Sequence, residues 1–228
     1  MRRPLVFIAL VSVLAISSWP RSASAQVSIW LQKGVSGVGA AVVLGYNKDQ
    51  STYGVNGGYS INGFVDLDLT AAYLSFPEDF GPGDLQGYAI EPRIEVHPLK
   101  QGPHMPISLG IGASAAKFFF VSDTLDSRDQ TLDGWNVNVD ASVYRFFKLA
   151  PRFGITPAVG AGFVHSWAGL KSRSGTDSST DDTFRFAVGT YFAYLDDGGR
   201  IWGVAPAVSV GDDDVTTVSV QAGIVWPL

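Results

Sequence analysis

The feature that most constrains this fold is an alternation of apolar and polar residues with a period of two. It is clearest in three segments, Val65–Tyr73, Trp135–Val143 and Thr217–Trp226. In each segment one face is entirely apolar, whereas the other carries Asp, Asn, Ser, Thr, Gln or Gly and a single Ala, Ala72. Successive side chains point to opposite sides of a β-strand, so this period indicates strands and excludes helices.

The same pattern recurs along the rest of the chain and gives about ten strands. Each is close to the length of about 9–11 residues that a tilted strand needs to cross a bilayer. We therefore predict an all-β fold, an antiparallel up-and-down transmembrane β-barrel of about ten strands, with eight strands as the alternative. The predicted strands are roughly 36–47, 51–61, 64–75, 84–97, 106–119, 135–147, 152–167, 183–195, 201–210 and 216–226.

The connections between these strands alternate in length. Short turns are predicted at Asn62-Gly63, where both residues tolerate the positive φ of a type I′ turn, and at Lys148–Pro151 and Asp196–Arg200. The two longest loops, Val121–Gly134 and Ala168–Asp182, fall at the other ends of the strands. Outer-membrane barrels have this layout, with the short turns in the periplasm. An even number of strands then places both termini on the periplasmic side.

A soluble barrel also alternates, but it turns its polar face to water and is normally rich in Lys and Glu there. Residues 26–228 contain only six Lys and three Glu. Aromatic residues also gather at the strand ends in two groups, as they do at the two interfaces of a bilayer. One group is Tyr46, Tyr53, Tyr73, Trp135, Trp167 and Phe184, and the other is Phe147, Phe153, Phe192, Tyr194, Trp202 and Trp226. Both observations favour the membrane barrel.

The first 25 residues have the features of a cleaved secretory signal. Arg2 and Arg3 precede an apolar run from Leu5 to Ile16, and Ala23-Ser24-Ala25 forms a small-residue cleavage site. We divide the chain into a signal peptide at 1–25, an N-terminal lead-in at 26–35 and the barrel domain at 36–228. The lead-in is expected either to precede the first strand or to line the lumen.

Charge and cysteine content exclude several classes of function. Without the three arginines of the signal, 13 basic residues remain against 21 acidic ones, so a nucleic-acid partner is not expected. The absence of Cys excludes disulfides, thiolate metal sites, a Cys nucleophile and a lipoprotein acyl anchor. No apolar run after the signal is long enough for a membrane-spanning helix.

The signal peptide, the Gly58–Gly63 hairpin sequence and the alternating last strand resemble the small outer-membrane β-barrel proteins of Gram-negative bacteria, a porin-like family that includes the OmpA-like and OmpW-like barrel domains. Members usually end on an aromatic residue; here Trp226 is in register but is followed by Pro227-Leu228. The resemblance implies a location in the outer membrane, contact with lipid and lipopolysaccharide, insertion by the barrel-assembly machinery, and a monomer. It does not imply one activity, because members include channels, adhesion or resistance factors and a few enzymes.

The predicted inward faces carry a charge network with more acids than bases, consisting of Asp66, Asp68, Glu91, Arg93, Glu95, Asp140 and Arg185. Buried charges need partners or water. In a ten-stranded barrel the third and eighth strands lie roughly opposite, so Arg185 is expected to face Asp66 and Asp68. The network then either closes the lumen or lines a narrow, cation-preferring passage for ions or small solutes.

We expect no catalytic residues, cofactor site or metal centre. His165-Ser166 suggests a hydrolase acting on lipid A or peptides, but adjacent strand residues point to opposite faces and cannot act together directly. Asp212-Asp213-Asp214 offers oxygen ligands for Ca²⁺ or Mg²⁺, although a solvated turn explains it as well. The expected function is therefore a non-enzymatic structural or surface-interaction role. A narrow cation-preferring channel is compatible with that expectation. The alternatives are an open pore and, last, a membrane-embedded hydrolase.

Overall fold

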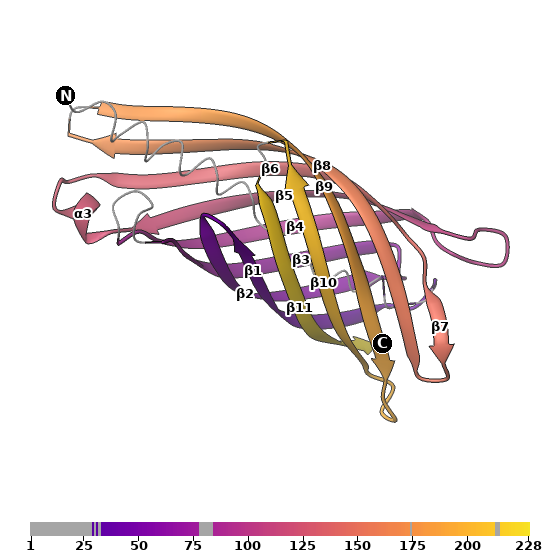
Figure 1. Ribbon diagram of the computed structural model, residues 1–228. Helices are drawn as coiled ribbons and strands as arrows, with labels where there is room; N and C mark the ends of the chain where they lie inside the picture. The colour runs from indigo at the N-terminus through magenta and orange to yellow at the C-terminus, as the bar shows by residue number, and fades with distance from the viewer. Residues whose placement is uncertain (1–28, 30, 32, 78–83, 174, 213–214) are drawn as a thin grey trace.

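The fold is a closed antiparallel β-barrel of ten strands, seen in a computed structural model that describes residues 29, 31, 33–77, 84–173, 175–212 and 215–228 (Figure 1). Each strand pairs with its neighbour in the chain, and β1 pairs with β11. Pairing of β6 with β8 completes the ring. The barrel strands are β1 (Gly37–Asn47), β2 (Gln50–Ile61), β3 (Val65–Ser75), β4 (Gln86–Leu99), β5 (Ser108–Val121), β6 (Thr131–Tyr144), β8 (Phe153–Ser172), β9 (Gly175–Leu195), β10 (Ile201–Gly211) and β11 (Thr216–Pro227). The predicted strand order and count are confirmed. No helix in these ranges is long and apolar enough to span a bilayer.

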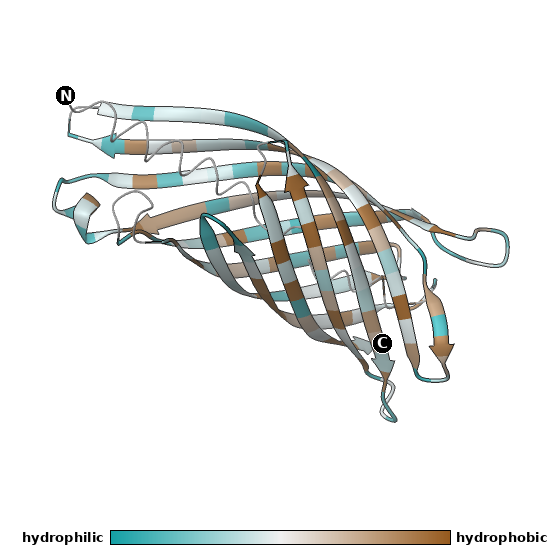
Figure 2. Cartoon of the chain, viewed as in Figure 1, coloured by the Kyte–Doolittle hydropathy of each residue, from teal (hydrophilic) through white to brown (hydrophobic). Residues whose placement is uncertain are grey.

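The alternating pattern is turned inside out relative to a soluble barrel. On β3, Leu67 and Leu69 are 45% and 55% exposed, whereas Asp66 and Asp68, which alternate with them, are buried. Figure 2 shows this alternation as bands of opposite hydropathy along the strands. The apolar residues therefore form the outer wall and the polar residues line the lumen, as a barrel surrounded by lipid requires.

Aromatic residues form a row at each end of the outer wall. At one end Tyr53, Tyr73 and Tyr88 lie on successive strands, with ring centroids 6.4 and 5.6 Å apart. At the other end Phe153 pairs with Tyr194, and Tyr194 pairs in turn with Trp202. The two rows match the aromatic belts that membrane interfaces select.

The ends of the barrel differ as the sequence predicts. The β2–β3 connection is Asn62–Phe64, in which Asn62 and Gly63 have φ of 52° and 65° and the Phe64 amide donates to the Ile61 carbonyl at 2.9 Å. This is the expected type I′ geometry. The β5–β6 connection at the other rim is longer and contains a short helix, α3 (Asp123–Asp126).

The predicted loop at Ala168–Asp182 is wrong, because most of it is strand. Strand β8 continues to Ser172 and β9 begins at Gly175, and the pairing is unbroken from Phe153 opposite Tyr194 to Ser172 opposite Gly175. Beyond Leu170, the described residues of this extension are polar or Gly on both faces and largely exposed, so the apolar alternation that identifies a membrane strand is missing there. We call residues 168–182 the outer arm.

A short strand, β7 (Phe147–Ala150), lies outside the ring and continues the line of β6 along the edge of β8. The predicted turn at Lys148–Pro151 therefore lies partly in strand. The two strands are separated at Arg145–Phe146, where the side chain of Gln101 replaces β5 as a partner. Its Oε1 accepts from the Phe146 amide at 2.7 Å, and its Nε2 donates to the Phe146 carbonyl at 3.1 Å.

Candidate functional site

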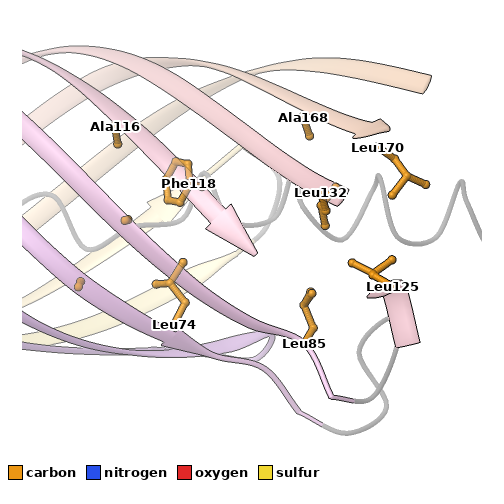
Figure 3. Close-up of a cluster of buried hydrophobic side chains, with 10 residues drawn as sticks. Leu74, Leu85, Ala116, Phe118, Leu125, Leu132, Ala168 and Leu170 are labelled. Atoms are coloured by element: carbon orange, nitrogen blue, oxygen red, sulfur yellow. The ribbon is translucent and has the colours of Figure 1, made fainter. Parts of the chain in front are cut away.

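The lumen is filled in layers, and the layer at the long-loop end is apolar. Figure 3 shows Leu74 from β3, Phe118 from β5 and Leu132 from β6 lying across the same space. Leu85, Leu125 of α3 and Leu170 of the outer arm pack into the same cluster, and Leu74 is fully buried. We call this the outer apolar layer. In this layer the inward residues of the strands are apolar, so the rule that inward residues are polar does not hold. Residues of the loops and of the outer arm supply the rest of the layer.

Below this layer, Arg93 on β4 holds the main ion pairs of the described lumen. Its Nη1 donates to Asp140 Oδ2 at 2.6 Å, and its Nη2 donates to Asp140 Oδ1 and to Glu95 Oε2, both at 2.7 Å. Asn138 Nδ2 donates to Asp140 Oδ2 at 2.7 Å. The guanidinium thus joins β4 to β6 across the intervening β5, with charge-assisted hydrogen bonds that offset part of its burial.

Two glycines on β5 make room for these side chains. A Cβ at Gly112 would overlap the Arg93 guanidinium, and a Cβ at Gly110 would overlap the Glu95 carboxylate and lie 2.8 Å from Ser142 Oγ. Gly112 pairs with Glu95 on one side and with Asp140 on the other. The two glycines of β5 therefore leave the space through which the Arg93 side chain reaches Asp140.

His97 belongs to this network but was missing from the predicted site residues. Its Nε2 lies 3.3 Å from Asp66 Oδ2, and its Nδ1 lies 2.9 Å from the hydroxyl of Tyr144. The side chains of His97 and Asp66 are completely buried. Because His97 follows Glu91, Arg93 and Glu95 at steps of two, the alternation could have identified it. The sequence analysis placed it at the strand end instead, outside the lumen network.

The predicted network residues lie on inward faces, although not all of them touch. Asp66 pairs in register with Glu95 and Asp68 with Arg93. Glu91 accepts from the Ser114 hydroxyl at 2.5 Å. The ion pairs described above are formed by Arg93, with Glu95 and Asp140. The sequence analysis had instead expected Arg185 to face the acids of the third strand.

Arg185, on β9, lines a cavity of about 70 Å³ together with Asp140, Gly160, Gly162 and Tyr191. Gly162 on β8 lies in register between Asp140 and Arg185. The cavity therefore lies over a position of β8 that has no side chain. A space of this size and polarity accommodates a few water molecules. The small inward residues of β8 and β9 therefore leave a cavity, whereas the space along β4 to β6 is filled by the Arg93 ion pairs.

The short-turn end of the lumen holds a second apolar group, to which the N-terminal lead-in contributes. Ile29 is buried with Tyr144, Tyr191 and Ala205, and Leu31 is buried against Val225. The backbone amide of Gly34 donates to the Asn62 carbonyl at 2.9 Å and fixes the segment to the β2–β3 turn. Of the two expectations for residues 26–35, the described residues favour a segment that lines the lumen.

On the outer wall, His165 Nδ1 lies 2.6 Å from Asp182 Oδ1, and both side chains are partly exposed. The His165 ring also lies 5.7 Å from that of Trp135. Ser166 is buried on the opposite face of β8. The two adjacent residues therefore lie on opposite sides of the wall, as the period of a strand predicts.

Within the described ranges, no group of three or more His, Asp or Glu side chains is arranged to hold a metal ion. The turn at Asp212-Asp213-Asp214 lies largely outside the described residues.

Comparison with known proteins supports the fold. Neither a protein-family model nor a curated protein matches the sequence. The translocator domain of the autotransporter NalP from Neisseria meningitidis is similar in structure, with a TM-score of 0.53 and 12% identity over 96% of this chain and 98% of that domain. The β domain of the Bordetella autotransporter BrkA gives a TM-score of 0.52 and 12% identity over 84% and 99%. Ail of Yersinia pestis is 14% identical over 86% and 100%, with a TM-score of 0.41. The chain therefore has the fold of the outer-membrane β-barrels, as predicted.

Proposed function

We propose that this protein is a closed barrel of the Gram-negative outer membrane with a structural and surface-interaction role, and that it is neither a transporter nor an enzyme. The observation that carries the proposal is the outer apolar layer. An ion entering from the long-loop end would have to lose its water among Leu74, Phe118 and Leu125, and apolar constrictions of this kind exclude ions by dewetting. The ion pairs of Arg93 and the burial of Ile29 support closure farther along the lumen.

The surface that such a barrel offers to a partner is the outer arm together with α3. The arm continues five residues beyond Trp167 of the aromatic row, about 17 Å of strand. Arg173 in the arm forms an ion pair with Asp129, next to α3. This contact joins the arm to the β5–β6 loop and supports a single preformed surface.

The wall and the rims support the remaining assignments. The exposed apolar band suits contact with outer-membrane lipid and lipopolysaccharide, and barrels of this type reach the membrane through the barrel-assembly machinery. The short-turn rim, where β1 begins and β11 ends, is assigned to the periplasm. A monomer, exported through a cleaved signal at residues 1–25, is the simplest form consistent with a closed ring.

Single-channel recording in planar bilayers tests the proposal. The purified mature barrel is expected to give no steady conductance, because the outer apolar layer stays dry. The control is Leu125→Ser with Phe118→Ser, which makes two positions of that layer polar and is expected to produce brief openings. A stable conductance of the unmodified barrel would contradict a closed lumen.

A narrow cation passage is the second candidate, favoured by the excess of lumen acids and by the cavity beside Arg185. Replacing the guanidinium in Arg185→Ala is expected to admit water and leave acids in excess. In a conducting barrel this substitution raises the preference for cations over anions, measured as a reversal potential in a salt gradient. In a closed barrel it leaves the current at zero.

The hydrolase alternative has the His165–Asp182 pair as its only geometric support among the described residues. It is tested by incubating the barrel with lipid A and with peptides, using His165→Gln as the comparison. Turnover that His165→Gln abolishes would establish an enzyme and overturn the non-enzymatic assignment.

A further inference from the structure

One cavity of the described chain is not explained by closure of the barrel. It has a volume of about 330 Å³ and lies at the short-turn end, beside β7 (Figure 1). The lead-in borders it with Ile29, Leu31 and Val35, and the segment that contains β7 borders it with Phe146 and Lys148. The cavity therefore lies between the lead-in and β7.

Small inward residues at the strand ends leave this space. Gly154 on β8 and Ala193 on β9 are partners in register, and both border the cavity. They alternate with Phe153 and Tyr194 of the outer aromatic row, so they face the lumen. A Cβ at Gly154 would overlap the Phe146 ring, which therefore lies against bare backbone. The cavity thus lies inside the mouth of the barrel.

The walls of the cavity suit an apolar chain. Apart from Lys148 and Arg152, the bordering residues are apolar or Gly. Such walls offer dispersion contacts to a chain of CH₂ groups and little hydrogen bonding to water. A volume of about 330 Å³ is near the lower end of the range of small-molecule sites, which is about 300–1,000 Å³. This size suits one acyl chain rather than the two of a phospholipid.

The two charged residues that border the cavity are both cations. Lys148 on β7 is exposed and forms no ion pair within the described ranges. Arg152 forms an ion pair with Asp197, but the Asp197 side chain is 84% exposed, so water screens the pair. Asp196, the other acid of this turn, accepts a hydrogen bond from Arg200 instead. The charge beside the cavity is therefore positive and complements an anion.

We propose that this cavity binds an anionic amphiphile with one acyl chain, a long-chain fatty acid or a lysophospholipid, and that Lys148 and Arg152 hold its carboxylate or phosphate. The planar guanidinium of Arg donates two parallel hydrogen bonds to either group, and Lys adds a point charge. The acyl chain lies between Leu31 and Phe146 and ends at Ile29, so the ligand is held rather than passed through the lumen.

Photo-cross-linking tests the site in the mature barrel folded into phosphatidylcholine nanodiscs. The probe is palmitate with a diazirine on its chain, and the labelled peptides are located by mass spectrometry. We expect labels on peptides that contain residues 29–35 and 146–154. Unlabelled palmitate or lysophosphatidylglycerol is expected to displace the probe, whereas hexadecanol, which has the same chain without a charge, is not. The more effective of the two competitors identifies a carboxylate or a phosphate as the preferred head group.

One matched pair of variants tests the charges. Lys148→Gln with Arg152→Gln is expected to lower the labelling about fivefold or more, because two partly screened charge contacts are lost. Lys33→Gln with Arg145→Gln removes the same charge from exposed side chains of the same rim and is expected to leave the labelling unchanged. Unheated gels confirm that each variant is folded.

A second pair tests the cavity with all charges kept. Ala193→Leu places a larger side chain in the cavity and is expected to lower the labelling. Ala222→Leu adds the same volume to the outer wall, where Ala222 pairs with the exposed Val42, and is expected to have no effect. This pair still decides the question if the doubly substituted charge variant does not fold.

Three results would overturn the proposal. An unmodified barrel without displaceable label would mean that the chain itself fills the cavity. Labels confined to outer-wall peptides, or displaced equally by hexadecanol, would show only general contact with lipid. Equal losses in the two charge variants would show attraction to a basic rim without a site. None of these outcomes depends on the conductance measurement, because the outer apolar layer lies at the other end of the lumen.

Discussion

The two halves of the barrel wall build their inner surfaces in opposite ways. Strands β3, β4 and β6 turn charged side chains inward and pair them with one another, as in the contact of Arg93 with Asp140. Strands β8 to β11 turn mostly small residues inward, such as Gly160, Gly189 and Ala207, and a cavity remains in front of them. Outside, both halves carry a band of exposed apolar side chains. The comparison teaches that the lumen is filled on one side by paired charges and on the other by a few larger apolar side chains, Ile29 of the lead-in and Tyr191 of β9.

The largest expected effect comes from breaking the charged half at Arg93. Arg93→Ala leaves Glu95 and Asp140 buried without their cation, which is expected to cost about 3–5 kcal/mol of unfolding free energy. Urea titration of the barrel in lipid vesicles, followed by tryptophan fluorescence, measures this loss.

Arg185 is the matched position in the small-residue half. Arg185→Ala is expected to cost less, about 1–3 kcal/mol, because water in the adjoining cavity can solvate the groups left behind. Equal losses at Arg93 and Arg185 would show that the two halves do not differ in the way described.

The second prediction concerns the outer wall, where the halves are expected to behave alike. Val139→Arg on β6 and Val188→Arg on β9 each place a cation among exposed apolar side chains of the lipid face. Each is expected to cost about 2–4 kcal/mol near the middle of the bilayer. Folding yields in vesicles check this, and a large penalty at only one of the two positions would mean that the apolar band does not encircle the barrel.

The third prediction sharpens the role of glycine in the charged half. Gly112→Ala pushes a methyl group into the Arg93 guanidinium and is expected to cost about 1–3 kcal/mol. Gly57, on the outer face of β2, has nothing closer than 4.0 Å to an added Cβ, so Gly57→Ala is expected to stay within about 0.5 kcal/mol. The same urea titration measures both variants and compares the packed position at Gly112 with the open position at Gly57.

The smallest effect is expected at the short-turn rim of the small-residue half, in the β9–β10 turn. A hydrogen bond from Trp202 Nε1, together with bonds from Arg200, lowers the pKa of Asp196 from 3.8 to about 2. Because the folded state binds this proton less tightly than the unfolded state, the contribution is complete above pH 4 and is lost as the pH falls from about 4 to 2. The stability of Asp196→Asn is therefore expected to fall less over this range than that of the unmodified barrel. Identical pH profiles would contradict the assignment.

Much of the barrel could be read from the sequence because a bilayer imposes a simple rule on each strand. Asp66 and Asp68 alternate with Leu67 and Leu69, and this fixes both the strand and its lumen face. The outer arm was missed because strand pairing in water needs only backbone hydrogen bonds. Polar residues on both of its faces, such as Ser178 on one and Ser179 on the other, give no alternation to detect.

The partners within the lumen could not be predicted from alternation alone. Whether Arg93 or Arg185 meets Asp140 depends on the register of three strands and on the space above Gly112. His97 was accessible to the same reasoning that found Glu95, and it was missed because the strand end was placed at that residue. Leu125 contributes to the outer apolar layer from a loop, where no strand period applies.

The unbroken pairing of the outer arm has a consequence for how this protein can diverge. Ser166 opposite Asp181 and Ser172 opposite Gly175 belong to one ladder that satisfies its own backbone groups. Adding or deleting one residue on each strand near the tip keeps the register below it. Substitutions there do not reach the lumen, except at Ala168 and Leu170. The length and chemistry of the tip are therefore free to change while the strand pairing of the barrel below it keeps its register.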